Sequence, residues 1–371
     1  SEGWPGLQSP RCAGMEVLLA GTLKGHKAAV IGVASASSEA DPLALTSSED
    51  GSLRLWDLRT QRSVRAIFPQ LEGNGAGSNS VCEALGSCSF TNRASPTQGV
   101  LAACGPQLLA FDLRGSNQVI LRSAPSASAS AGDDINDFAV SCEAGLIAVP
   151  TDANDVQVLS VEDLRVLRTM TKGHSNIVGC ARFRPSAGGG DLELFTGGFD
   201  ERLVQWNPVS GKLRTTLQAK RLLPSEDDEG EGNPNQIFNP PFILSLAVSS
   251  KGDLGVGLGN GSIVVLSPER LPHGEAPWCA TNAHMAPTDC LAWLQTASAA
   301  KEAPTLVSAG RDCVLALWGL HGGKGKKGRG SGAQPLQRLT QVKLEEKVNS
   351  MTTAPEGRIL LADTSPNVSI L

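Results

Sequence analysis

Four residue types recur at fixed spacing in three places along the 371-residue chain. In each place a histidine is followed by a hydroxyl residue ten positions before a tryptophan and by an aspartate six positions before it. The three sets are His26, Thr46, Asp50 and Trp56; His174, Thr196, Asp200 and Trp206; and His284, Ser308, Asp312 and Trp318. Such self-similarity is typical of repeat architectures, in which each unit buries its apolar face against its neighbours. The spacing therefore predicts one array of similar units, although the length alone would suggest two domains.

Weaker units occupy the gaps between these three sets. Each ends in an apolar residue where the strong units have tryptophan, and Asn260-Gly261 between two apolar runs is typical of a tight β-hairpin. The seven equivalent positions are Trp56, Phe111, Leu159, Trp206, Leu266, Trp318 and Ile370. Consecutive positions lie 47 to 60 residues apart, which exceeds the roughly 40–45 residues of four-stranded repeats. We attribute the excess to three low-complexity insertions that we expect to be disordered, at 123–133, 224–236 and 322–334.

The three strong sets resemble the repeats of the WD-repeat family, in which each unit is a four-stranded blade of a β-propeller. The resemblance covers nearly the whole chain from Met15. It implies an all-β, seven-bladed propeller over residues 15–371, preceded by a disordered leader at residues 1–14.

In that family the matching histidine, hydroxyl, aspartate and tryptophan form a buried hydrogen-bond network within the blade. A buried imidazole needs partners for both ring nitrogens, and a carboxylate with a hydroxyl supplies them. We therefore interpret His26, His174 and His284 as structural; the alternative is a role in catalysis or metal binding.

The two ends of the chain predict how the ring closes. The last unit, 347–371, supplies only about three strands, and the strand-like run 17–23 is left over at the front. Pairing this run with the last unit would complete the seventh blade and remove two exposed sheet edges. The sequence thus predicts a single ring closed by its two ends, and we expect a monomer.

Composition excludes several classes of protein. The chain has 32 Lys and Arg against 37 Asp and Glu, a net charge of −5, which argues against a nucleic-acid binder with one broad basic face. No apolar stretch approaches the roughly 18 residues that a membrane helix needs. The nine cysteines are scattered without a Cys-x-x-Cys pair. We therefore expect buried thiols in the reducing nucleus and cytoplasm, in place of a zinc site or a disulfide framework.

No catalytic constellation stands out in the sequence. The Gly-x-Ser-x-Gly, Gly-x-x-x-x-Gly-Lys-Ser/Thr and His-Glu-x-x-His motifs are all absent. The run 255–259 is glycine-rich, but no predicted helix follows it, and a phosphate cradle needs a helix N-terminus. We predict a protein that is not an enzyme and needs no cofactor or metal; the alternative is an enzyme with a site in the central channel.

The informative local motif is Trp56-Asp57-Leu58-Arg59, which Phe111-Asp112-Leu113-Arg114 echoes one unit later. It resembles the WDxR box of substrate receptors of the cullin-4 ubiquitin ligase, with phenylalanine replacing tryptophan in the second copy. The resemblance implies that Arg59 and Arg114 lie on the bottom of the ring and contact the DNA damage-binding adaptor protein. A guanidinium suits this role because it offers planar, multidentate hydrogen bonding. The predicted adaptor-binding residues are Trp56, Asp57, Arg59, Phe111, Asp112 and Arg114.

Other runs are similar to one group of WD-repeat proteins regarded as receptors of that ligase. They are 173–185, 239–246, 346–349 and 359–363. This resemblance implies an adaptor contact together with an undefined protein substrate. The alternative is a scaffold subunit of a nuclear or ribonucleoprotein assembly unrelated to ubiquitin, in which the basic run 324–329 contacts a partner. Without such a role, this run and the acidic run 226–231 are solvated loops.

Overall fold

The computed structural model describes residues 16–38, 40–72, 79–82, 84–96, 98–114, 119–123, 135–184, 191–224, 239–267, 277–295, 305–320 and 334–371. The predicted leader and nearly all of the three predicted insertions lie outside these residues. At their edges, Ser123 is the last residue of a strand, Pro224 lies within the described part, and Gln334 is the first residue of a strand.

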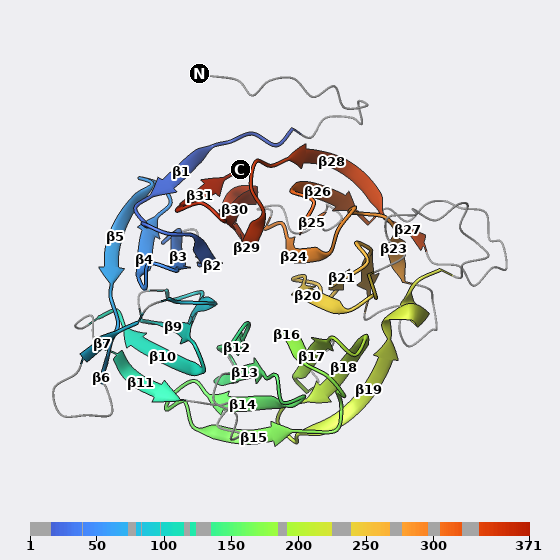
Figure 1. Ribbon diagram of the computed structural model, residues 1–371, viewed down its shortest axis with the longest axis horizontal. Helices are drawn as coiled ribbons and strands as arrows, with labels where there is room; N and C mark the ends of the chain where they lie inside the picture. Colours follow the sequence, from blue (N-terminus) through green and yellow to red (C-terminus); the bar gives the residue numbers. More distant parts are fainter. Residues whose placement is uncertain are drawn as a thin grey trace.

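Seven sheets stand in a ring around a central axis, which confirms the predicted seven-bladed β-propeller (Figure 1). Within each blade the strands are antiparallel, and the first strand, such as β2, β16 or β29, lies nearest the axis (Figure 1). The first blade consists of β2 (Val30–Ser35), β3 (Leu43–Ser48), β4 (Leu53–Asp57) and β5 (Arg62–Ile67), and the second of β8 (Cys88–Phe90), β9 (Gly99–Cys104), β10 (Gln107–Asp112) and β11 (Val119–Ser123). The third consists of β12 (Ala139–Ser141), β13 (Leu146–Pro150), β14 (Val156–Ser160) and β15 (Val166–Met170), and the fourth of β16 (Val178–Arg184), β17 (Glu193–Gly198), β18 (Arg202–Asn207) and β19 (Lys212–Gln218). The fifth blade consists of β20 (Ile243–Val248), β21 (Leu254–Leu258), β22 (Ile263–Leu266) and β23 (Trp278–Ala280), and the sixth of β24 (Thr288–Trp293), β25 (Thr305–Gly310), β26 (Val314–Gly319) and β28 (Gln337–Lys343). The seventh consists of β29 (Val348–Ala354), β30 (Arg358–Asp363), β31 (Asn367–Ile370) and β1 (Gly21–Lys24).

The apolar core lies between the blades. Buried apolar side chains of the described residues form seven clusters, one at each seam between neighbouring blades. All seven predicted tryptophan-equivalent positions lie on the third strand of a blade and are at most 3% exposed. Trp56 belongs to one cluster with Ala354 and Leu360 of the seventh blade, and Trp206 to one with Val158 of the third blade. Each tryptophan therefore fills the seam to the preceding blade.

The N-terminal strand closes the ring as predicted. β1 pairs antiparallel with β31, from Gly21 opposite Ile370 to Lys24 opposite Asn367. Leu23 is 1% exposed and belongs to the cluster that contains Trp56. The strand starts at Gly21 and not at Val17, and Leu18 before it is 63% exposed. One blade is thus built from both ends of the chain.

Two short additions to the ring have no counterpart in the predictions. β6 (Gln70–Glu72) and β7 (Asn79–Val81) form a two-stranded sheet beside the second blade. β27 (Gln334–Pro335) joins the fifth blade as a parallel strand beside β23, before the chain continues into β28 of the sixth blade. Among the described residues, no helix is long or apolar enough to cross a membrane.

One disulfide corrects the expectation for the cysteines. Cys82 and Cys104 are bonded, with their Cα atoms 6.8 Å apart, and the bond ties the segment after β7 to the end of β9. Spacing along the sequence could not reveal this pair, because 22 residues separate the two cysteines and the fold alone brings them together. Cys88, Cys180, Cys279 and Cys290 are buried free thiols.

We predict that the Leu23→Ala variant loses about 2–5 kcal/mol of unfolding free energy, because it leaves a cavity at the seam that closes the ring. Urea denaturation measures this loss. The matched control is Leu18→Ala, which truncates an exposed leucine of the same segment and should change the free energy by less than about 0.5 kcal/mol.

Deletion of residues 16–23 should lower the melting temperature of the whole protein. An unchanged melting temperature would contradict closure of the ring through β1.

Candidate functional site

Three blades contain a buried chain of hydrogen bonds that joins the predicted structural residues. In the first blade, Trp56 Nε1 donates to Thr46 Oγ1 over 2.8 Å, and Thr46 Oγ1 lies 2.7 Å from His26 Nε2. His26 Nδ1 lies 3.2 Å from Asp50. The fourth blade repeats this arrangement with distances of 2.9, 2.8 and 3.0 Å, and the sixth with 2.8, 2.8 and 3.1 Å. The structure therefore brings all four residues of each predicted set together.

One assignment of protons satisfies every group in the chain. The indole N–H donates to the hydroxyl, the hydroxyl donates to Nε2 of a neutral imidazole, and Nδ1–H donates to the carboxylate. In the fourth and sixth blades the other carboxylate oxygen accepts the backbone N–H of the residue after the histidine, at 2.8 Å for Ser175 and Met285. In the first blade Asp50 Oδ2, which lies nearest His26 Nδ1, also accepts the backbone N–H of Lys27 over 2.8 Å. The network thus fastens the loop that enters the blade to its second and third strands.

The electrostatics favour this neutral form of the histidine. Burial lowers the pKa of His26 and of His174, although the adjacent carboxylates raise it. Burial raises the pKa of Asp50, but hydrogen bonds from the Ser52 side chain and from the backbone N–H of Lys27 outweigh it and hold the pKa at about 2. The network of the first blade therefore combines an ionised carboxylate with an uncharged imidazole near neutral pH.

The two arginine motifs form equivalent turns at the ends of β4 and β10. Asp57 Oδ1 accepts the backbone N–H of Arg59 over 2.8 Å, and Asp112 Oδ1 accepts that of Arg114 over the same distance. Both strands end at the turn that leads to the outermost strand, so the two turns lie on one face of the ring. Replacement of tryptophan by Phe111 leaves the turn unchanged, because Phe111 fills the same slot at 1% exposure.

The motif residues divide by burial into two groups. Trp56 and Phe111 are each 1% exposed, so they can act only by positioning the turns. Arg59 and Arg114 are exposed. Arg59 donates to the carbonyl of Ala40, while Arg114 folds back onto Asp112 with bonds of 3.0 and 2.8 Å. Hydrogen bonds from Arg114 lower the pKa of Asp112 to about 2.

Arginines of the preceding blade hold both turns in place. Arg358 of β30 donates to the carbonyl of Leu58 over 3.4 Å, and Arg65 of β5 donates to the carbonyl of Leu113. Leu58 and Leu113 are the third residues of their motifs. The turn of the first blade is therefore tied to the seventh blade, and the turn of the second blade is tied to the first.

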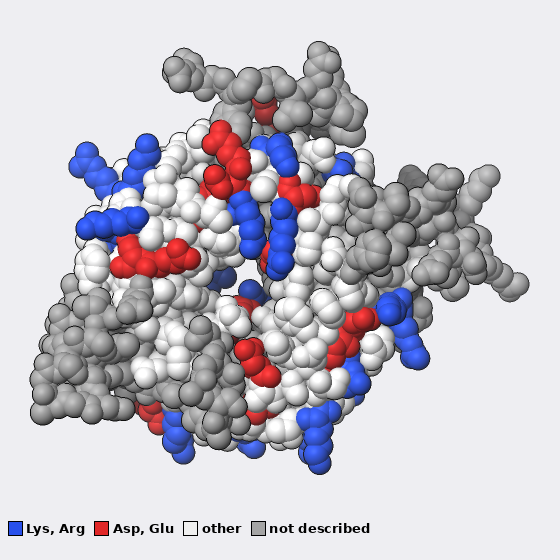
Figure 2. Space-filling view, in the orientation of Figure 1, with Lys and Arg blue, Asp and Glu red and all other residues white. Residues whose placement is uncertain are grey.

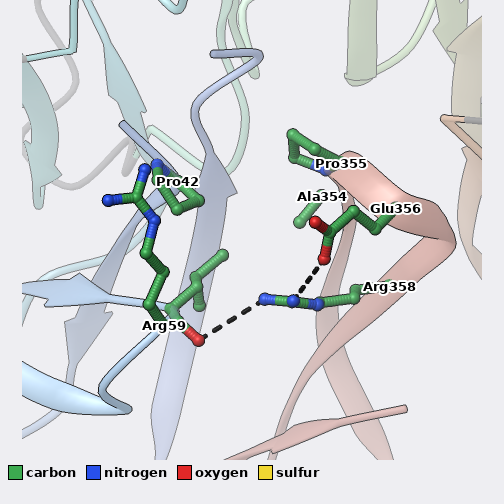
Figure 3. A pocket seen from close by; sticks show the side chains of 7 residues that line it. Pro42, Arg59, Ala354, Pro355, Glu356 and Arg358 are labelled. Carbon is green, nitrogen blue, oxygen red and sulfur yellow. Dashed lines mark hydrogen bonds and ion pairs between the residues drawn. The ribbon is translucent and has the colours of Figure 1, made fainter. Parts of the chain in front are cut away.

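A small pocket opens at the seam between the seventh and first blades (Figure 3). One wall comes from the first blade and the other from the turn between β29 and β30, with Arg59 on the first and Arg358 on the second (Figure 3). The lining residues are Pro42, Leu58, Arg59, Ala354, Pro355, Glu356 and Arg358. We call this hollow the seam pocket.

Charged side chains also surround the central opening. Figure 2 shows Lys and Arg interspersed with Asp and Glu there, without one sign covering the described part of this face. On the innermost strand of the fourth blade, Arg182 pairs with Asp137 at 2.7 Å. The described residues contain no group of three or more His, Cys, Asp or Glu side chains arranged to hold a metal ion.

Comparisons with known proteins agree with this architecture. The family model described as "WD domain, G-beta repeat" matches residues 18–57, which span β1 to β4. The crystal structure of the WD40 β-propeller domain of Doa1 superposes over 95% of both chains with a TM-score of 0.63, at 16% sequence identity. The chain is a seven-bladed β-propeller that contains a WD repeat at residues 18–57.

A curated relative of this chain is the WD repeat-containing protein 53 homolog of Dictyostelium discoideum. The two are 26% identical over 254 residues, which is 66% of this chain and 63% of the relative. The match thus spans slightly less than two thirds of the length of that protein.

Sequence reasoning missed Arg65 and Arg358, because a single arginine on a strand has no distinguishing pattern. It also missed a third Asp-Leu-Arg run in the propeller, Asp163-Leu164-Arg165, after β14 of the third blade. Arg165 lies six residues after its tryptophan-equivalent Leu159, whereas Arg59 and Arg114 lie three residues after theirs. The third run therefore has another register relative to the blade, although Arg165, with its side chain 73% exposed, is as exposed as Arg114 at 72%.

We predict that Thr196→Val destabilises the propeller by about 2–5 kcal/mol, because it leaves the buried indole N–H of Trp206 and Nε2 of His174 unpaired. Thr196→Ser keeps the hydroxyl and should retain most of the stability. Thr215→Val, at an exposed position of β19, controls for loss of a hydroxyl as such. Equal losses for Thr196→Val and Thr196→Ser in urea denaturation would contradict the relay.

The lowered histidine pKa values predict a dependence of stability on pH. Below a pH of about 6.5 the unfolded chain binds protons that folded His26 and His174 do not, so the free energy of unfolding falls as the pH falls. Unfolding free energies between about pH 7 and about pH 5 measure this slope. His174→Gln cannot titrate there and should show a smaller slope than the unmodified protein; an equal slope would exclude His174 as a source of the dependence.

Proposed function

We propose that this propeller is a non-enzymatic interaction scaffold that presents a protein substrate to a cullin-4 ubiquitin ligase. In this role Arg59 and Arg114 bind the DNA damage-binding adaptor protein, and another part of the ring binds the substrate. The observation that carries the proposal is the pair of equivalent turns on adjacent blades, each with an exposed arginine two residues after the aspartate that caps the turn. The protein would act in the nucleus and the cytoplasm.

The hydrogen bonds of the two arginines support a role in binding. Arg114 and Asp112 form an ion pair at the surface, with side chains 72% and 28% exposed, and such pairs contribute little because solvent and salt screen them. Little free energy is therefore lost when a bound partner draws the guanidinium of Arg114 away from Asp112. By contrast, the backbone bonds from Asp57 and Asp112 fix where each arginine leaves the ring. The base of each arginine is thus fixed while its head group remains adaptable.

A scaffold role also agrees with the way in which the fold uses its histidines. Three of the five histidines are bound within the blade networks, where each ring nitrogen already has a partner. The WD40 propeller fold is typically used to bind other proteins. The substrate of the complex is a protein that binds a surface distinct from the two turns.

We predict that the Arg59→Ala, Arg114→Ala double variant binds the purified adaptor at least about 30-fold more weakly, because buried arginine contacts at interfaces often contribute 2 kcal/mol or more. Biolayer interferometry with the full chain measures the affinity, and the melting temperature checks folding. Arg165→Ala is the matched control, since it removes an equally exposed arginine from an Asp-Leu-Arg run in the other register. A folded double variant with unchanged affinity would refute the proposal.

A further inference from the structure

The lining of the seam pocket carries charges that suit an acidic side chain. Its two arginines stand on opposite walls, and its lining contains one carboxylate, that of Glu356 (Figure 3). The lining thus carries one more positive than negative charge. Pro42, Ala354 and Pro355 supply apolar surface around the arginines.

We propose that the seam pocket receives an aspartate or glutamate of the bound adaptor, with the carboxylate between Arg59 and Arg358 and the aliphatic part of the side chain against Pro42 and Pro355. The inference rests on the proposed function, because it names a contact made by the same partner. It extends the binding surface to the seventh blade, which carries no copy of the arginine motif.

Glu356 occupies the place of the incoming carboxylate in the unbound protein. It forms an ion pair with Arg358, and the two side chains are 66% and 32% exposed. An exposed pair of this kind is weak and screened by salt. A carboxylate held inside the pocket by two guanidinium groups forms stronger, charge-assisted bonds. The adaptor residue can therefore displace Glu356 from Arg358.

The backbone of the β29–β30 turn fixes the positions of Glu356 and Arg358. Glu356 has a φ of 66°, which is rare for a residue with a side chain, and Gly357 follows with a φ of 74°. The N–H of Gly357 donates over 3.0 Å to the carbonyl of Gln295 in the sixth blade. Arg358 is anchored in turn on the carbonyl of Leu58. Left-handed backbone at such a residue persists where the surroundings impose it, and it is frequent at binding sites.

The inference distinguishes two variants of opposite effect. Arg358→Gln removes one of the two cations and should weaken adaptor binding at least tenfold. Glu356→Gln removes the competing carboxylate but keeps the length of the side chain, so it should tighten binding about threefold or more. If Glu356 had only a structural role in the turn, neutralising its charge would not tighten adaptor binding.

The experiment measures the affinity of the purified adaptor for the full chain and for each variant by biolayer interferometry. Tighter binding by Glu356→Gln together with weaker binding by Arg358→Gln supports the inference. Unchanged or weaker binding by Glu356→Gln overturns it, and this variant decides the matter if Arg358→Gln fails to fold. If Arg59→Ala weakens binding while the two pocket variants do not alter it, the inference fails and the proposed function stands. If the unmodified chain does not bind the adaptor, both fail.

Discussion

Burial of apolar side chains between blades, and not within them, is the constraint on which this propeller depends. Each of the seven apolar clusters draws residues from two neighbouring sheets, so a blade completes its core only when both neighbours are present. The ring must therefore close, and the pairing of β1 with β31 supplies the last seam. The hydrogen-bond networks of the first, fourth and sixth blades then fix the loops that enter those blades. The other four blades use aliphatic or phenylalanine side chains in the same slot, which fill space without the relay.

The seams between blades determine the geometry of the proposed binding surface. Arg358 and Arg65 reach across from the preceding blade to the carbonyls of Leu58 and Leu113, and so the geometry of each motif turn depends on a neighbouring sheet. A change at the seam between the seventh and first blades would alter Arg59 even though the motif itself stayed intact. The proposed adaptor contact and the stability of the ring therefore depend on the same seams.

Much of the fold was predictable because its signals are local and repeated. The offsets of hydroxyl, aspartate and tryptophan fixed the blade positions, and the incomplete last unit implied closure by the N-terminal run. The parts that were missed depend on contacts between residues distant in sequence. Arg358 meets Leu58 across 300 residues, and the Cys82–Cys104 bond requires the second blade to be folded. The strand pairs β6–β7 and β23–β27 involve two or three residues a side, too few to show a periodic pattern.

Closure by the two ends also sets an order of events during synthesis. β1 leaves the ribosome before any blade is made, but its partner β31 follows only after all the other strands. At about 5–20 residues per second, the interval is on the order of tens of seconds. Throughout this time the backbone edge of β1 lacks its partner strand, and Leu23 lacks the part of its cluster that the seventh blade supplies. The nascent chain is thus an open arc, and its first strand stays at an unpaired sheet edge until the last strand is made.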